Sequence, residues 1–330
     1  MIFNIIFYFF PAFLSYSNVV KEDPKTQQLK AYPSQWRNVY NKSTEEVAAM
    51  IHKDKIDILI ELTGHTAGNR LDVVAMKPAP IQITYLGYPN TTGLQSVDYR
   101  FVDDCTDPWN TTQQFTEELV RLPKCFLTYT PPQPAPAVAA LPAINNKYIT
   151  FGSFNNLAKI SQNVLVVWST ILRNIPNSRF VMKCKPFAST AVQQRILAQF
   201  ANNGIDSSRI DLMPLMQRNY DHLKAYELID IALDSWPYAG TTTTCESLFM
   251  GVPVITLKGD CHSHCIGVSL LNQVGLTQWI ATNDNDYVRI AIQNAKNIER
   301  LQVLLFFPFL LKSKHFFNVN SFLNRIYDLL

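Results

Sequence analysis

Glycine is scarce in this sequence of 330 residues, and none of its 11 glycines belongs to a GxGxxG or Walker phosphate-binding motif. No stretch is dense in Lys or Arg, and the net charge is only +3, so binding to nucleic acid through a basic patch is not expected. Charged residues make up 17% of the chain and hydrophobic residues 47%. This balance excludes a disordered chain and predicts folded domains with a sizeable core.

Cysteine gives no sign of a disulfide scaffold or a structural metal site. The six cysteines contain no CxxC pair, so we expect a reducing compartment such as the cytoplasm or the nucleus. The segment Cys261-His262-Ser263-His264-Cys265 has soft ligands, but they are packed too closely for a zinc site, whose ligand pairs lie far apart. We therefore predict no metal and no cofactor. The sequence also shows no Ser/His/Asp arrangement and no internal repeat.

The two apolar ends are too interrupted to cross a membrane. The N-terminal run has no basic region before it, and Asn4 and Pro11 break it, which favours a buried strand or an irregular start. The C-terminal run 301–317 is broken by Pro308. We interpret it as a terminal helix that lies against a surface.

Strand-like and helix-like segments alternate between these ends, which is typical of an α/β fold with parallel sheets. Each expected strand is a short apolar run, and these runs span 55–64, 81–89, 148–154, 179–186, 210–215 and 252–257. The expected helices cover a segment after Ser161, 191–204, 221–233, 243–250 and a pattern from about 285. The Pro-rich stretch 131–143 has the composition of a linker and cannot propagate a helix.

These patterns predict three parts of the chain. An N-terminal α/β unit spans 1–136, a linker spans 137–146, and a C-terminal unit with the terminal helix spans 147–330. Ligands of parallel sheets bind at the carboxyl ends of the strands, so the loops that leave strands are the places where a site is expected.

The first such loop is FGSFNNLAKIS (151–161), which leaves a strand and enters a helix. Backbone N–H groups and the helix dipole favour an anion at such a place, and Lys159 adds a positive charge. An ordinary strand–helix loop with a solvated lysine is the alternative.

The second loop contains four consecutive threonines, Thr241–Thr244, before a short helix. Their hydroxyls and the free amides of the helix suit a diphosphate, and Glu246, one turn later, could reach a ribose diol. A polar run that only caps the helix is the alternative. The third region surrounds His222, which could stack on or hydrogen-bond a nucleotide, or could simply cap a surface helix.

Long segments resemble a known family. DILIELTGHTAGNRL (57–71), KPAPIQITYLGYPNTTGL (77–94), FGSFNNLAKI (151–160) and DSWPYAGTTTTCESLFMGVPVITLKG (234–259) are similar to the catalytic region of the SPINDLY/O-GlcNAc transferase family, and more to the SPINDLY-type protein O-fucosyltransferases. The resemblance covers roughly 15–295. It implies a GT-B fold of two Rossmann-like lobes and metal-independent, inverting transfer of a sugar to Ser or Thr of proteins. The only small molecule implied is the donor, GDP-fucose or UDP-GlcNAc.

The resemblance assigns roles to the phosphate-facing residues. Lys159 matches the catalytic lysine on the donor diphosphate, and Asn156 matches its amide partner. Thr242 and Thr243 match the pair that contacts the phosphates. Thr241 stands where the O-GlcNAc transferases have a histidine. A lysine, hydroxyls and helix amides would then stabilise the leaving nucleoside diphosphate.

Two further positions concern the nucleoside. Glu246 matches the acidic residue that binds the ribose, and His222 matches a histidine beside the base. Ala225 replaces an arginine of the O-GlcNAc transferases, which favours another base or sugar and is consistent with GDP-fucose.

The chain departs from the family at its start. The tetratricopeptide repeats, the first strand of the N-terminal lobe and a histidine near the acceptor have no counterpart here, so we expect an N-terminally truncated catalytic region with an incomplete N-terminal lobe. A remnant that binds nucleotide or partner proteins without turnover is therefore the alternative to an enzyme. A glycosyltransferase for small molecules is a third possibility.

Overall fold

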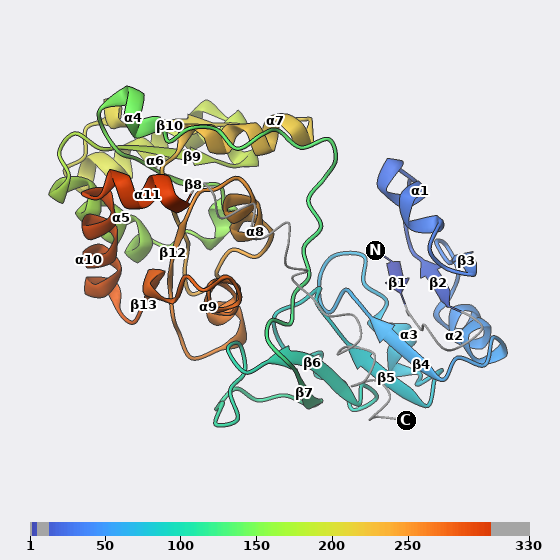
Figure 1. Cartoon of the computed structure of the whole chain (residues 1–330). Helices are drawn as coiled ribbons and strands as arrows, with labels where there is room; N and C mark the ends of the chain where they lie inside the picture. The colour runs from blue at the N-terminus through green and yellow to red at the C-terminus, as the bar shows by residue number, and fades with distance from the viewer. Residues whose placement is uncertain (1, 5–12, 305–330) are drawn as a thin grey trace. The chain divides into compact units, whose positions relative to one another are not determined.

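The computed structural model describes residues 2–4 and 13–304. The chain divides into two compact units, with the boundary between Phe126 and Leu127. Figure 1 follows the chain from the first unit in blue to the second in green, yellow and red. None of the helices that the structure describes is long and apolar enough to cross a membrane.

Unit 1 contains two small sheets. In the first, β1 (Ile2–Asn4) pairs antiparallel with β2 (Leu14–Ser17), which pairs parallel with β3 (Gln35–Asn38). The second is fully parallel in the order β4-β5-β6-β7 and is formed by Ile58–Glu61, Ile81–Thr84, Tyr99–Asp103 and Glu118–Leu122. The helices of this unit are α1 (Pro24–Lys30), α2 (Thr44–Lys53) and α3 (Leu71–Ala75).

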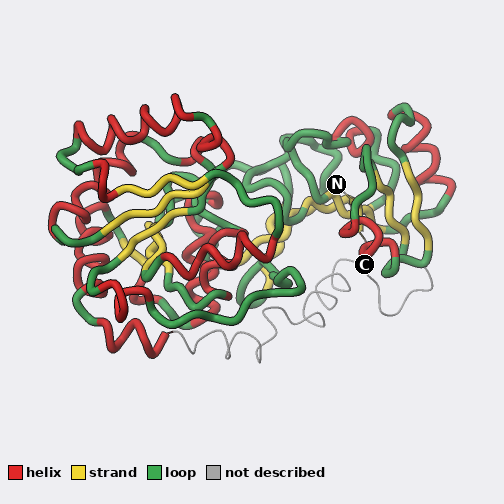
Figure 2. Tube along the Cα trace, turned by 90° about the horizontal axis from the view of Figure 1, so that it is seen from above, coloured by secondary structure: helices red, strands yellow, loops and turns green. Residues whose placement is uncertain are grey.

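Unit 2 is built on one parallel sheet of six strands in the order β10-β9-β8-β11-β12-β13, drawn in yellow in Figure 2. The strands are β8 (Thr150–Ser153), β9 (Arg179–Lys183), β10 (Ile210–Met213), β11 (Ile231–Leu233), β12 (Val254–Leu257) and β13 (Ile280–Ala281). The helices are α4 (Pro142–Asn146), α5 (Gln162–Asn174), α6 (Thr190–Asn202), α7 (Asn219–Lys224), α8 (Thr242–Phe249), α9 (His262–Val274), α10 (Asp284–Ala295) and α11 (Ile298–Leu304).

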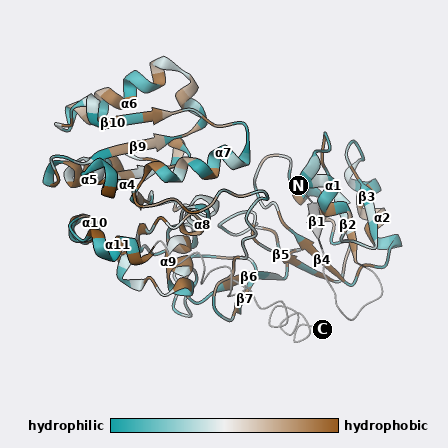
Figure 3. Cartoon of the chain, turned by 45° about the horizontal axis from the view of Figure 1, so that its top comes forward, coloured by the Kyte–Doolittle hydropathy of each residue, from teal (hydrophilic) through white to brown (hydrophobic). Residues whose placement is uncertain are grey.

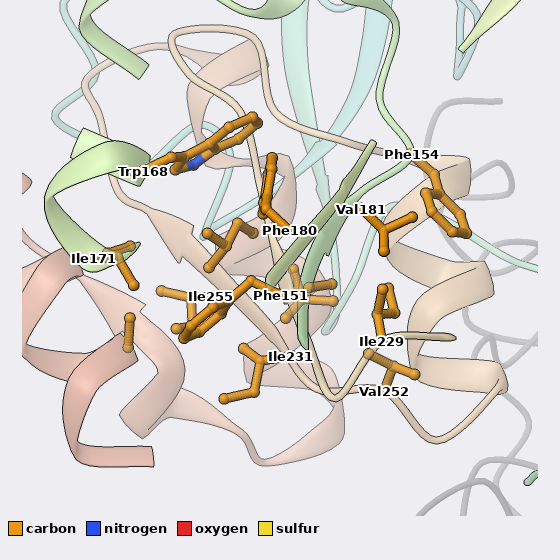
Figure 4. Packing of buried hydrophobic residues seen from close by; sticks show 14 of the residues in the cluster. Phe151, Phe154, Trp168, Ile171, Phe180, Val181, Ile229, Ile231, Val252 and Ile255 are labelled. Atoms are coloured by element: carbon orange, nitrogen blue, oxygen red, sulfur yellow. The ribbon is translucent and has the colours of Figure 1, made fainter. Parts of the chain in front are cut away.

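The core of unit 2 forms where apolar strand residues meet the apolar faces of helices. Phe151 of β8, Phe180 of β9 and Ile231 of β11 point into one cluster together with Trp168 of α5 (Figure 4). In Figure 3 the helices of this unit carry both hydrophilic and hydrophobic residues, as expected of amphipathic helices packed on a sheet. The start of α5 is fixed by Ser161, whose hydroxyl accepts a hydrogen bond from Val164 N at 3.3 Å.

The structure confirms the α/β fold with parallel sheets, but it corrects one predicted helix. The segment 221–233 is not one helix: α7 ends at Lys224, a 3-10 turn η4 (Ala225–Leu228) follows, and Ile231–Leu233 is strand β11. This strand lies in the middle of the sheet, between β8 and β12. A buried strand of three apolar residues is too short to establish a period of its own, so the sequence pattern merges it with the preceding helix.

Smaller corrections concern the chain ends and the Pro-rich stretch. Helix α4 begins inside 131–143, because Pro142 occupies the first helical turn, where its missing N–H costs nothing. The N-terminal apolar run contributes β1 and the start of β2, while residues 5–12 lie outside the described residues. Of the predicted terminal helix only the beginning, in α11, is described.

Candidate functional site

The loops selected from the sequence leave the same edge of the unit 2 sheet. Strands β8, β9 and β11 are parallel, and β8 is paired with both of the others. The loops that follow these strands therefore emerge side by side at the carboxyl edge. The loop after β10 leads to α7 at this same edge.

Asp234, directly after β11, organises the loop that leads to the threonines. The residue is 2% exposed. Its Oδ1 accepts hydrogen bonds from the backbone N–H groups of Ser235 at 2.9 Å and Gly240 at 2.7 Å. Asn155 Nδ2 donates to Oδ1 at 3.2 Å, and Thr256 Oγ1 donates to Oδ2 at 2.8 Å. Burial raises the pKa of Asp234 to about 6 against these donors.

Two later segments complete the surroundings of Asp234. Helix α9 approaches closely because Gly267 has no side chain; a Cβ there would lie 2.3 Å from Thr256 Oγ1 and 2.9 Å from Asp234 Oδ2. Tyr287 of α10 donates its hydroxyl proton to the backbone carbonyl of Asp234 at 2.9 Å. The loop is therefore held by side chains and backbone from four elements.

Lys159 belongs to the 3-10 turn η1 (Leu157–Lys159) and crosses to the neighbouring loop. Its Nζ donates to the carbonyl oxygen of Ala239 at 2.9 Å and lies 3.7 Å from the centroid of the Tyr238 ring. Burial lowers the pKa of Lys159, and the charge of Asp234 opposes this effect. The structure thus brings the predicted lysine to the threonine loop.

Asn156, the predicted amide partner, caps η1. Its Oδ1 accepts a hydrogen bond from Ala158 N at 3.1 Å, which leaves its Nδ2 group available as a donor. The preceding residue, Asn155, was not predicted and has the more buried position: its Oδ1 accepts a hydrogen bond from Thr243 Oγ1 at 2.8 Å. Asn155 therefore connects the two loops, while Asn156 faces solvent.

The threonines behave differently from a capping run. Helix α8 begins at Thr242, and the side chain of Thr241, at the N-cap position, makes no hydrogen bond to the helix amides. Thr242 is exposed, Thr243 is bonded to Asn155, and Thr244 is buried. The amides of the first turn of α8 are therefore left without a side-chain cap, which weakens the interpretation that the run only caps a helix.

His222 and Glu246 lie together at this edge of the sheet. His222 Nε2 is 2.8 Å from Glu246 Oε2. Tyr226 donates its hydroxyl proton to the same carboxylate oxygen at 3.3 Å and to Thr243 O at 3.1 Å. Burial raises the pKa of Tyr226, and the nearby Glu246 adds to this. The roles of His222 on the base and of Glu246 on the ribose stay predictions.

Lys183 is the main residue that the sequence interpretation missed. It ends β9, is 2% exposed, and donates from Nζ to His222 Nδ1. Its ammonium lies 4.5 Å from the centroid of the Phe154 ring. Burial lowers the pKa of Lys183 to about 8, while Glu246 opposes the shift. The available signal was a lysine at the end of an otherwise apolar strand.

The segment Cys261–Cys265 supports the threonine loop. Ala239 N donates to the carbonyl oxygen of Ser263 at 3.0 Å. Across 2–4 and 13–304, no three His, Cys, Asp or Glu side chains form a group that could hold a metal ion.

Comparison with known proteins relates this chain to glycosyltransferases. It is 52% identical over 295 residues to the probable UDP-N-acetylglucosamine–peptide N-acetylglucosaminyltransferase SPINDLY of Eustoma exaltatum subsp. russellianum, covering 88% of this chain and 32% of that protein. It is 30% identical over 288 residues to the probable UDP-N-acetylglucosamine–peptide N-acetylglucosaminyltransferase SEC of Arabidopsis thaliana, covering 84% and 29%. The chain spans about a third of the length of these curated relatives.

The fold is also similar to that of glycosyltransferases. A solved structure of a lysine-to-methionine mutant of Thermobaculum terrenum O-GlcNAc transferase superposes with a TM-score of 0.87 and 32% identity, covering 95% of this chain and 60% of that one. The two α/β units, each with a parallel sheet, are the lobes of a GT-B fold. The family model of glycosyl transferase family 41 matches residues 39–130 and 138–325. With its two parallel sheets and these matches over most of its length, the chain belongs to glycosyl transferase family 41.

Proposed function

We propose that this chain is the catalytic region of a nucleotide-sugar-dependent protein O-glycosyltransferase that acts on Ser or Thr. The observation that carries the proposal is the contact of Lys159 with Ala239, in the loop that leads directly into the uncapped first turn of α8. A cation, backbone amides and the hydroxyl of Thr242 together suit a diphosphate. Glu246 lies one turn further along α8, within the same loop system.

The chemistry follows from the charge that develops on the leaving group. In inverting transfer the acceptor hydroxyl oxygen attacks the anomeric carbon from the face opposite the diphosphate. The bond from that carbon to the diphosphate oxygen breaks, the electron pair stays on the diphosphate, and the acceptor hydroxyl gives up its proton to the solvent. Lys159 and the α8 amides would stabilise this charge without a metal ion. Removing one such donor typically costs about 2.7–4 kcal/mol of transition-state stabilisation.

For the donor we propose GDP-fucose. The support is the similarity of 151–160 and 234–259 to SPINDLY-type sequences, together with the higher identity to the SPINDLY relative than to the SEC relative. The names of both relatives give UDP-N-acetylglucosamine, which is the competing donor. Ala225 is buried in η4. Its small side chain is therefore not used as support for a guanine base.

A ligand panel followed by a transfer assay tests the proposal. Melting temperatures are measured with GDP, GDP-fucose, UDP and UDP-GlcNAc; a ligand at a hundred times its Kd adds about 2.7 kcal/mol to the free energy of unfolding. We expect the GDP pair to stabilise most, and radiolabelled fucose to enter protein acceptors. Stabilisation by UDP-GlcNAc instead would assign the other donor. Binding without transfer would leave a nucleotide-binding remnant.

A further inference from the structure

A chain of polar contacts runs beneath the proposed ribose site, and it begins at a buried lysine. Among the described residues, the only hydrogen-bond partner of Lys183 Nζ is His222 Nδ1. His222 Nε2 in turn contacts Glu246 Oε2 at 2.8 Å. These three residues come from β9, α7 and α8, so the chain joins three elements of the sheet edge.

The ammonium of Lys183 on one side and the carboxylate of Glu246 on the other determine which ring nitrogen of His222 carries the proton. An ammonium can only donate, so His222 Nδ1 accepts from Lys183, and the ring proton of the neutral imidazole must be on Nε2. There it can be donated to the carboxylate of Glu246. The opposite tautomer would place two donors face to face at Nδ1 and a lone pair against the carboxylate at Nε2. The lysine thus selects the tautomer that the carboxylate needs.

In this arrangement the two carboxylate oxygens of Glu246 have different surroundings. Oε2 receives both the His222 proton and the Tyr226 hydroxyl. Oε1 has no partner among the residues that the structure describes, which leaves it for a hydroxyl of a bound ligand. A carboxylate whose second oxygen is held by two donors cannot rotate away without losing both.

We propose that Lys183 is a positioning residue of the donor site: by fixing the His222 tautomer it holds Glu246 with one oxygen free to bind the ribose diol of a nucleoside diphosphate. The proposal rests on the proposed function and goes beyond it, because it gives a role in donor affinity to a residue that does not itself touch the ribose.

The proposal predicts that donor affinity falls as the pH rises. The competent form has a charged lysine, and the pKa of Lys183 is lowered to about 8, so donor affinity is present below this pH and is lost as the pH rises through it. The other titratable groups that interact with Glu246 are Tyr129 and Tyr226, and Cys245 interacts with both tyrosines. Burial raises the pKa of both tyrosines, so they stay neutral across this range.

The test compares variants of Lys183 with the unchanged chain. Dissociation constants are measured for GDP and 2′,3′-dideoxy-GDP, and in parallel for UDP and its dideoxy analogue, between about pH 6.5 and pH 9.5. The unchanged chain should favour the ribonucleotide about tenfold near neutral pH, a typical value for one hydrogen bond to a charged group. This preference should disappear at the alkaline end.

Lys183→Met should remove the preference at every pH and raise the KM for the donor more than it lowers kcat. Lys183→Arg keeps the charge throughout, so it should retain part of the preference and lose the alkaline decline. Lys185→Met, two residues later and exposed, is the matched control and should behave as the unchanged chain. If Lys183→Met fails to fold, the pH series of the unchanged chain and of Lys183→Arg still decides.

Two outcomes would overturn the inference in different ways. A Lys183→Met variant that keeps the ribose preference and its pH profile would overturn the positioning role alone, even if it melts at a lower temperature. An unchanged chain that binds neither GDP nor UDP would overturn the proposed function and this inference with it.

Discussion

The carboxyl edges of the two parallel sheets use buried acids in the same way and differ in what is added to them. In unit 1, Glu61 Oε1 accepts hydrogen bonds from the backbone N–H groups of Thr63 and Gly64, the latter at 2.7 Å. Asp103 does the same for Thr106 N and Phe126 N, at 2.8 and 2.7 Å. In both cases a carboxylate closes its own loop.

In unit 2 Asp234 closes its loop in the same manner, but Lys159 contacts this loop, the loop leads into an uncapped helix start, and Lys183 contacts His222 at the same sheet edge. The difference indicates that parallel-sheet topology gives ordered loops at the carboxyl edge of each sheet. Affinity for an anion depends instead on the side chains that these loops carry. The following predictions break or sharpen this contrast.

The largest effect is expected at Lys159, the cation that contacts the loop closed by Asp234. Lys159→Ala should lower the transfer rate about 10²–10³-fold, because one stabilising donor of the leaving diphosphate is lost. Lys159→Arg should restore activity only in part, since a planar guanidinium does not reproduce a compact ammonium. Initial rates of sugar transfer measure this effect. The control is the exposed Lys147→Ala, and transfer at an unchanged rate by Lys159→Ala would disprove the assignment.

The second prediction compares the two loop-closing acids. Asp234→Asn and Glu61→Gln should each lower the free energy of unfolding by about 1–3 kcal/mol, the range for hydrogen bonds to a buried charged group. Only Asp234→Asn should also weaken GDP binding, because only its loop leads to the proposed diphosphate site. Denaturation and calorimetric titration of the two variants give both quantities. Equal losses of GDP affinity would contradict the assignment of the site to unit 2.

The third prediction separates two adjacent threonines. Thr243→Ala removes the hydrogen bond to Asn155 and should lower the stability of the ligand-free protein by about 1 kcal/mol. Thr242→Ala should leave that stability unchanged, because its hydroxyl is exposed. Both should weaken donor binding. A Thr242→Ala variant that is destabilised but binds donor normally would instead favour the capping interpretation.

The smallest effect concerns pH and has opposite signs in the two units. Asp230 of unit 2 accepts hydrogen bonds from Ala143 N and Thr150 N at 2.9 and 2.8 Å, and burial raises its pKa to about 6. The folded state then binds more protons than the unfolded state between about pH 4 and pH 6, so this contribution to stability falls as the pH rises. Asp230→Asn should remove a slope of stability against pH on the order of 1 kcal/mol per pH unit.

Glu117 of unit 1 is the matched case with the other sign. Burial alone would raise its pKa, but hydrogen bonds from Thr92 and Thr91 outweigh burial and lower it. Its contribution to stability is present above the unfolded pKa and is lost as the pH falls. Urea denaturation from about pH 4 to pH 7 should therefore show that Asp230→Asn and Glu117→Gln change the pH slope in opposite directions; slopes of the same sign would refute the comparison.

The sequence was sufficient for the parts of the site that depend on local signals. A strand followed by small polar residues and a helix start predicts an anion-binding loop, and on this basis Lys159, Thr243 and Glu246 could be selected before the fold was described. His222 and Glu246 reach the same edge because both follow parallel strands of one sheet, although these strands, β10 and β11, are separated by β9 and β8.

The remaining parts could not be predicted because they depend on the strand that the pattern merged with a helix. Without β11 in the middle of the sheet, Asp234 has no position, and neither Asn155 nor Thr256 has a visible partner. Lys183 ends a strand, where a lysine normally extends into water, so its burial under His222 appears only once α7 covers it.

The environment of Asp234 also has a consequence for the order in which the chain can become ordered during synthesis. Its partners Asn155, Thr256 and Tyr287 lie 79, 22 and 53 positions away in the sequence. When the ribosome adds the threonines to the chain, Thr256, Gly267 and Tyr287 have not yet been made. Nascent chains therefore carry an unclosed loop until α10 has emerged, and the proposed donor-binding edge is among the last parts of this unit to form.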